Sequence, residues 1–208
     1  MKLAMRLSSF LACSALAAFL AGCSDQPGVP EKKAEKAAEP VTGQSALYRM
    51  YQVARSWASD AEVLQMNSMH VTDVPDIHGK AGAWQATFVS ESKNAARIYT
   101  YSVIDAEPSL HQGVFPSQPE AWTGPASGKK PFLIAAVKID TDVAYKTALK
   151  NAADAAKQNQ RQTISFLLEK EAKFTNPSWR VIWGESTGTS GLSAYVDAST
   201  GEYLETMH

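Results

Sequence analysis

Residues 192–203 read Leu-Ser-Ala-Tyr-Val-Asp-Ala-Ser-Thr-Gly-Glu-Tyr, and this stretch decides the fold. Its apolar residues Leu, Ala and Val recur at every second position, which is typical of a half-buried strand. Asp197 and Ser199 are residue types that satisfy turn amides, and Gly201 supplies the positive φ that closes a hairpin. The stretch therefore predicts a strand, a tight turn and a last strand over residues 203–207.

The same period-two pattern recurs upstream of this hairpin. It predicts strands over residues 84–88, 97–103, 164–168 and 179–183. Residues 92–94 (Ser-Lys-Asn) separate the first two of these strands and predict an antiparallel hairpin. Residues 132–137 form a short apolar run and predict a further, buried strand.

Two segments have the spacing of amphipathic helices. Between Leu47 and Leu64, apolar residues recur at i, i+3, i+4 and i+7, with Thr42 or Ser45 as the candidate cap. The second helix begins at residues 140–142 (Asp-Thr-Asp) and has an alanine-rich apolar face, which suits close packing on a sheet. Such faces are core surfaces much more often than cofactor sites.

The two halves of the chain read as one unit used twice. Trp84 and Trp179 begin similar strands 95 residues apart, and residues 91–92 (Glu-Ser) then align with residues 185–186 (Glu-Ser). Further on, residues 104–106 (Ile-Asp-Ala) align with residues 196–198 (Val-Asp-Ala). The predicted fold class is α+β, with two repeated helix-plus-antiparallel-sheet units that either share one sheet or form two.

The C-terminal hairpin resembles a PepSY-type module, which ends in a strand, a turn and a V-D-A-x-T-G-x-apolar hairpin. The resemblance covers residues 142–208 well, and residues 45–106 only by the order of helix and sheet. It implies an extracytoplasmic, non-enzymatic module that often accompanies peptidases or other envelope proteins. This chain departs from the pattern because it has no peptidase domain and its first half is diverged.

The N-terminus predicts a lipid anchor. Lys2 and Arg6 precede an apolar run that ends in Leu20-Ala21-Gly22-Cys23, which resembles a lipobox. Residues 1–22 are then a lipoprotein signal peptide, and the sulfur of Cys23 carries the acyl chains that bind the membrane. Ser24 in place of aspartate favours the outer membrane, with the protein facing the periplasm. The alternatives are an ordinary secretory signal with a chance cysteine, or a short buried helix.

After cleavage, the composition of the chain offers no free thiol and only a small net charge. Cys13 leaves with the signal and Cys23 is acylated, so no thiol remains for a disulfide, a metal or a nucleophile. Loss of Lys2 and Arg6 takes the net charge from −1 to −3, which argues against a nucleic-acid partner. Residues 23–44 are predicted to form a lipid-anchored disordered tether. The first repeat then covers residues 45–106, a Pro/Gly connector covers 107–131, and the second repeat covers 132–208.

Two loops offer candidate sites for a partner. The connector is unusually long for a compact domain, so Trp122 within it is a candidate contact residue. Residues 184–191 (Gly-Glu-Ser-Thr-Gly-Thr-Ser-Gly) form a predicted hairpin tip, in which Glu185 and Ser186 are candidates. In each case the alternative is structural: a tryptophan that holds the connector to the sheet, and a flexible turn.

A metal site and an enzyme are the remaining possibilities. His70, Asp73, Asp76 and His78 supply two imidazoles and two carboxylates for a divalent ion, although without a recognised spacing, and a polar loop is the alternative. No hydrolase, metalloprotease or phosphate-binding motif occurs, and the equivalent glutamates of the two repeats fall on separate hairpins. We therefore expect a non-enzymatic periplasmic binding or regulatory lipoprotein without a cofactor, whose partner is an envelope protein or peptide. The alternative is a small-ligand or metal-binding envelope lipoprotein.

Overall fold

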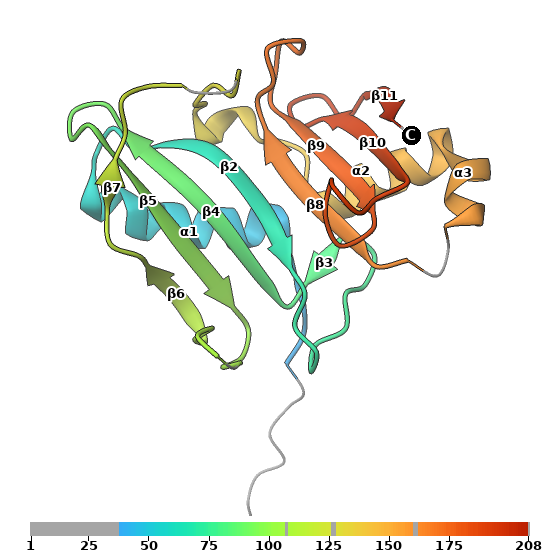
Figure 1. The fold of residues 1–208 in the computed structure, drawn as a ribbon, viewed down its shortest axis with the longest axis horizontal. Helices are drawn as coiled ribbons and strands as arrows, with labels where there is room; N and C mark the ends of the chain where they lie inside the picture. The colour runs from blue at the N-terminus through green and yellow to red at the C-terminus, as the bar shows by residue number, and fades with distance from the viewer. Residues whose placement is uncertain (1–37, 107, 126–127, 160–161, 208) are drawn as a thin grey trace, which may run out of the picture. The chain divides into compact units, whose positions relative to one another are not determined.

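One antiparallel sheet runs through both halves of the protein (Figure 1). The computed structural model describes residues 38–106, 108–125, 128–159 and 162–207. The predicted signal peptide, Cys23 and the tether up to residue 37 lie outside the described residues. Residues 38–44, which the sequence assigned to the tether, belong to the folded unit and include the start of the first helix.

The sheet has nine strands within the described residues, and all its pairings are antiparallel. The order is β11-β10-β9-β8-β2-β4-β5-β6, and β7 pairs with β5 beside β6. The strands are β2 (Glu62–Met69), β4 (Ala83–Ser90), β5 (Ala95–Ser102), β6 (Gly113–Pro116), β7 (Glu120–Ala121), β8 (Ile164–Glu169), β9 (Ser178–Trp183), β10 (Leu192–Asp197) and β11 (Tyr203–Met207). Two short strands, β1 (Val41–Thr42) and β3 (Lys80–Ala81), pair with each other separately.

The helices lie on one face of this sheet, behind the strands in Figure 1. They are α1 (Gly43–Trp57), α2 (Thr141–Asn151) and α3 (Ala153–Gln158), and a 3₁₀ helix, η1, spans Ile134–Ala136. Within the described part of the chain, no helix is both long enough and apolar enough to cross a bilayer. The α+β class predicted from the sequence is confirmed, and its helices and sheet form two layers around one main core.

The two halves have the same order of elements around the central pair β2 and β8. Each half consists of a helix followed by three successive antiparallel strands, α1-β2-β4-β5 and α2-β8-β9-β10, with the short β3 inserted in the first and the short α3 in the second. Asn67 of β2 faces Leu167 of β8 at the centre of the joint. Because β2 and β8 are antiparallel, the halves are related by an approximate two-fold axis at this point.

The tryptophans at equivalent places make equivalent hydrogen bonds. Trp84 Nε1 donates to the carbonyl of Val41 at 3.1 Å, and Trp179 Nε1 donates to the carbonyl of Ile139 at 2.8 Å. Each acceptor lies two residues before the first residue of its helix. The indole of each second strand thus fixes where its helix begins, and both rings are fully buried.

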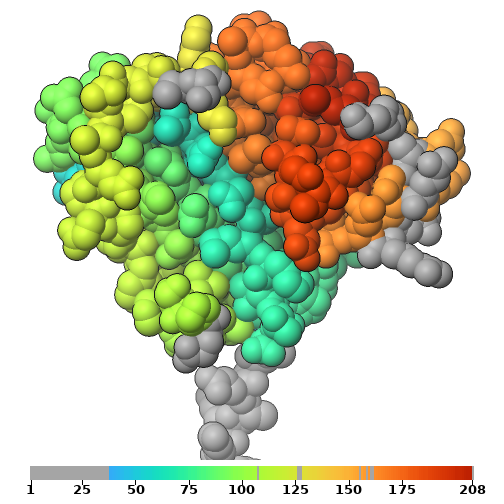
Figure 2. Space-filling model, viewed as in Figure 1, coloured from blue at the N-terminus to red at the C-terminus, as the bar shows by residue number. Residues whose placement is uncertain are grey.

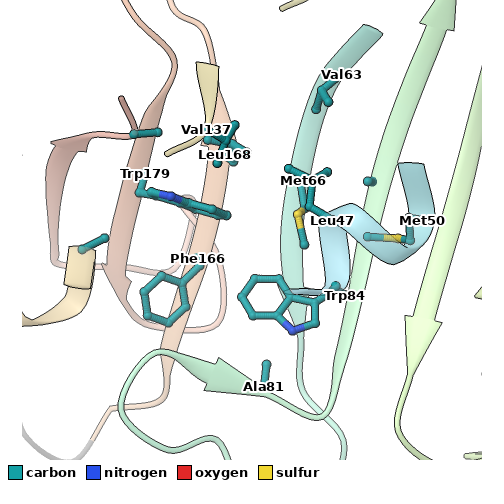
Figure 3. Packing of buried hydrophobic residues seen from close by; sticks show 14 of the residues in the cluster. Leu47, Met50, Val63, Met66, Ala81, Trp84, Val137, Phe166, Leu168 and Trp179 are labelled. Atoms are coloured by element: carbon teal, nitrogen blue, oxygen red, sulfur yellow. The ribbon is translucent and has the colours of Figure 1, made fainter. Parts of the chain in front are cut away.

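Aromatic rings also join the halves in the core (Figure 3). The rings of Trp84 and Trp179 meet edge to face, with centroids 6.4 Å apart. Phe166 of β8 lies 6.2 Å from Trp84, so side chains of three strands from both halves pack together. Buried residues of both halves belong to one core cluster, so each half buries part of its apolar surface against the other.

One carboxylate caps both main helices. Asp140 Oδ1 accepts from the amide of Thr141 at the start of α2, at 2.7 Å, and from the amide of Gln44 in α1, at 2.9 Å. The hydroxyl oxygen of Thr141 accepts from the amide of Gly43 at 2.8 Å. A Cβ at Gly43 would lie 2.7 Å from the Thr141 methyl, so only glycine permits this approach. Of the two predicted caps of α1, Thr42 occupies the cap position but makes no side-chain cap bond, and Ser45 lies inside the helix.

The first helix is shorter than the sequence pattern predicts, since that pattern extends to Leu64. It ends at Trp57, and residues 62–69 form β2, the strand that joins the halves. A bulge between Val63 and Gln65 shifts the register, so Val63 and Met66 both point into the core although they are three residues apart. Inward positions three apart imitate a helical period, which is why the sequence pattern concealed the strand.

Two smaller predictions are also wrong. Residues 132–137 contain one bridge, Val63 to Phe132, and then η1 instead of a strand. The ladders align Ser102 with Asp197, three residues from the predicted match at Asp105, since β5 already ends at Ser102. Separately, the predicted connector contributes two short strands, β6 and β7, which pair with β5 at the edge of the sheet.

Candidate functional site

A cavity of about 400 Å³ opens where the loop after β2 approaches α2 and the start of β8. Its lining combines an apolar floor with a polar rim. The lining residues are His70, Pro75, Asp76, Ile77, His78, Gly79, Lys80, Tyr145, Gln162, Thr163, Ile164 and Phe166. We call it the junction cavity, because residues of both halves form it.

A tight hairpin forms one wall of the junction cavity. The amide of Ile77 donates to the carbonyl of Lys80 at 3.0 Å, and the reverse bond measures 2.9 Å. His78 and Gly79 between them have φ of 50° and 88°, as a type I′ turn requires. The Thr141 hydroxyl donates to the Gly79 carbonyl at 2.5 Å, so the hairpin is attached to the start of α2.

Three of the four predicted metal ligands lie in this lining, and Asp73 does not. His70 Nδ1 is 3.3 Å from Asp76 Oδ2, in a pair whose histidine is largely exposed. Burial raises the pKa of the Asp76 carboxyl, while the hydrogen bond with His70 opposes that change. Among the residues that the structure describes, no three His, Cys, Asp or Glu side chains form a group that could hold a metal ion. The arrangement is a single acid–base pair.

A second cavity, of about 300 Å³, shares Tyr145, Gln162 and Ile164 with the junction cavity. Its other lining residues are mostly apolar: Leu149, Ala153, Ala156, Lys157 and Trp183. The two cavities therefore adjoin each other along the side of α2 and α3 next to β8.

The helix-free face of the sheet differs between the halves. In the second half, residues after β8 fold over Tyr195 of β10, which is 1% exposed. The Tyr195 hydroxyl donates to Glu171 at 2.8 Å, and the Phe174 ring lies 5.3 Å from the Tyr195 ring. The Lys173 ammonium lies 4.5 Å from that ring centroid and pairs with Glu205. This cover was not predicted from the sequence.

The same face of the first half carries uncharged side chains. The register places them on β2, β4, β5 and β8, away from the helices. They are Gln65, Asn67, Gln85, Thr87, Ile98, Thr100 and Leu167, which we call the open face. All except Thr87 are half-buried. Charged residues of the same sheet face surround the open face: Glu62 on β2, Glu169 opposite Gln65 and Arg180 opposite Leu167. The Lys129 ammonium donates to Gln65 Oε1 and pairs with Glu169, both at 2.9 Å. Figure 2 views the molecule from this side, with β2, β4 and β5 in teal and green.

The three predicted partner residues do not lie together. Trp122 is half-buried, and its amide donates to the carbonyl of Asn94 in the turn between β4 and β5. Glu185 and Ser186 are exposed on the loop between β9 and β10, where Ser186 Oγ lies 3.1 Å from Thr189 Oγ1. The strand directions put these two turns at opposite ends of the sheet (Figure 1), which also separates Glu91 from Glu185.

Comparison with known proteins gives no family. No family model matches the chain, and no curated protein matches it. Among solved structures, the chain is similar to the crystal structure of a candidate lipoprotein from Clostridium difficile 630, at 10% sequence identity and a TM-score of 0.44. The match covers 84% of this chain and 95% of that chain. A likeness at this level assigns neither a family nor a function.

Proposed function

We propose that this protein is a bacterial envelope lipoprotein that binds a partner protein through the open face and has no enzymatic activity of its own. The lipobox-like residues up to Cys23 support the anchor, and Ser24 favours the outer membrane with the folded unit in the periplasm. The resemblance of residues 142–208 to PepSY-type modules supports an extracytoplasmic binding or regulatory role.

The observation that carries the proposal is the lack of charge on the open face. Charged residues make up 20% of the chain, whereas the seven side chains of the open face are amides, hydroxyls and aliphatic groups. The charged residues Glu62, Glu169 and Arg180 of the same sheet face lie around this uncharged patch. Depletion of charge is the compositional mark of interface cores, because an unpaired charge is costly to desolvate. A folded partner with an uncharged surface suits this face, since flat sheet residues offer shape complementarity without a deep pocket.

The seven side chains of the open face include no acid–base group, and the neighbouring Glu169 is paired with Lys129, which supports binding without catalysis. None of the open-face side chains titrates near neutral pH, so none can act as a general acid or base there. The acid–base pair His70 and Asp76 lies in the junction cavity, and no serine or threonine hydroxyl donates to that histidine among the described residues.

Site-specific photocrosslinking in intact cells tests the proposal. A benzoylphenylalanine in place of Thr100 is expected to give one discrete crosslinked product, whereas the same group in place of the exposed Lys146 of α2 is not. A Cys23→Ser variant should abolish both the membrane association and the product. Equal products from both positions, or none from position 100, would contradict binding through the open face.

A further inference from the structure

The connector fills a free strand edge in the first half. Val63 lies at the start of β2, before β2 meets β8. The amides of Val63 and Phe132 each donate to the carbonyl of the other residue at 2.9 Å. Two residues earlier, the Lys130 amide donates to the carbonyl of Lys170, just after β8. A short extended segment with a buried phenylalanine thus completes this edge.

The approximate two-fold axis places an equivalent edge in the second half. Val63 pairs with Phe88 of β4, and Ile164 pairs with Trp183 of β9 at the same place on the equivalent strand. Asn67 and Leu167 face each other at the axis, and His70 and Lys170 each lie three residues after them, so His70 is equivalent to Lys170. Both Ile164 and His70 line the junction cavity. The cavity therefore occupies the place that the connector fills in the first half.

The backbone of Ile164 faces this cavity. The Gly184 amide donates to the Thr163 carbonyl at 2.8 Å, so odd-numbered residues of β8 make the bonds to β9. Antiparallel pairing alternates, and the amide and carbonyl of Ile164 point to the β2 side. Phe166 uses its amide on that side to donate to Ser68 Oγ at 2.9 Å. For Ile164, no described residue supplies such a partner.

We infer that the junction cavity is a binding site for an extended peptide segment of another protein, which adds to the free edge of β8. The residue at the centre of the segment exchanges both backbone hydrogen bonds with Ile164 and places a large apolar side chain on the floor formed by Tyr145 and Phe166. Two residues earlier, the segment donates an amide to the carbonyl of His70, as Lys130 does to Lys170.

The site is separate from the open face and goes beyond the proposed function. Its walls are held in place before binding, because the hairpin of His78 and Gly79 is attached to Thr141. A preformed wall lowers the ordering cost of the protein on binding. The adjoining cavity lined by Leu149 and Trp183 leaves room for a further apolar side chain of the segment.

The chain supplies its own probe for this site. Residues 128–134 (Gly-Lys-Lys-Pro-Phe-Leu-Ile) contain the segment that fills the equivalent edge, and a fluorescent peptide of this sequence can be titrated against the mature protein in mild detergent. The expected result is saturable anisotropy, with binding weakened about tenfold or more when phenylalanine becomes alanine in the peptide. Amide hydrogen exchange at Ile164 should slow when the peptide is bound.

Matched variants locate the binding. Ile77→Asp puts a charge on the cavity wall at a residue that is 44% exposed, and it should weaken binding about tenfold or more. Val143→Asp changes a residue that is 41% exposed on α2 and outside the cavity lining, and it should leave binding within about twofold. Circular dichroism melts of both variants check that they fold.

Three results would overturn the inference: no saturable binding, equal binding of the alanine peptide, or unchanged exchange at Ile164. Equal affinity for N-acetylphenylalaninamide alone would also overturn it and make the cavity a small-ligand site. The peptide result is independent of the open face, because crosslinking from position 100 does not involve the cavity residues. Failure of one proposal therefore leaves the other standing.

Discussion

The two halves of this protein share a frame and differ in the segments between strands. In each half an indole donates to the carbonyl before a helix, and three strands follow in the same order. The first half connects its first two long strands through residues 70–82, which form a cavity wall, whereas the second uses residues 170–177, which cover Tyr195. The frame therefore supplies stability, and the connecting segments decide which surfaces stay free.

The largest expected effect tests whether the frames are equivalent. Trp84→Ala and Trp179→Ala should each lower the free energy of unfolding by about 4 kcal/mol, because each removes a fully buried indole from the shared core. Their rings touch, so the double variant should cost less than the sum. Denaturant unfolding measures all three values. A large cost for one tryptophan and a small cost for the other would show that the halves are not equivalent.

The shared cap is the next largest effect. Asp140→Ala removes an acceptor from the first turns of α1 and α2 and should cost about 2 kcal/mol of unfolding free energy. Asp142→Ala is the control, since that carboxylate pairs with Lys146 on the surface, 3.4 Å away, and it should cost less than about 0.5 kcal/mol. Equal melting temperatures for the two variants would contradict the claim that Asp140 stabilises the contact between the starts of α1 and α2.

A smaller substitution tests whether the segment that covers Tyr195 stabilises the second half. Tyr195→Phe deletes the hydrogen bond to Glu171 and should cost about 1 kcal/mol. Thr100→Val changes the equivalent position of the first half and removes only a long hydrogen bond, 3.4 Å, from the Thr100 hydroxyl to the Phe115 carbonyl, so its cost should stay within about 0.5 kcal/mol. Similar costs for the two variants would mean that the cover does not stabilise the second half.

The smallest expected effect is a pH dependence that distinguishes the turn between β4 and β5 from the equivalent turn between β9 and β10. Bonds from the Ser92 amide and the Ser90 hydroxyl lower the pKa of Asp60 from 3.8 to about 2. The carboxylate therefore stabilises the turn of residues 91–94 fully above pH 3.8, and its contribution is lost as pH falls through about 2. Ser186 in the other half bonds to Thr189, which does not titrate.

Amide NMR shifts provide the measurement for these turns. The Ser92 amide shift should follow a titration with a midpoint of about 2, and the Ser186 amide should not titrate there. Asp60→Asn is the control and should remove the Ser92 titration. A midpoint for Ser92 near 3.8 would show that the carboxylate gains nothing from these bonds.

Strand alternation and helix spacing were sufficient to predict the α+β class, because their periods survive in the buried positions of β4, β9 and β10. The start of α2 was predicted as well, and Asp140 caps it. The bulge in β2 disguised a strand as helix, and long-range contacts decided the rest. No local pattern in the sequence states that Asp140 also caps α1, or that Phe132 pairs with Val63.

The candidate sites were predictable in their residue types and not in their arrangement. His70, Asp76 and His78 lie in the lining of one cavity, as their closeness in sequence suggested, but a hairpin fixes His78 apart from the His70–Asp76 pair. The open face carries no motif, because Gln, Asn and Thr at alternate positions look like any solvated strand. Only the register of four strands shows that they form one surface.

Cysteine protection in native envelopes tests the central claim most directly, since Cys23 is the only cysteine after the predicted cleavage site. Thr100→Cys on the open face and Lys150→Cys on α2 are labelled with a maleimide, in intact envelopes and in the purified protein. Labelling at position 100 should be slower in envelopes than in the purified protein, with position 150 unchanged. Equal labelling rates at position 100 in both preparations would contradict a partner on the open face.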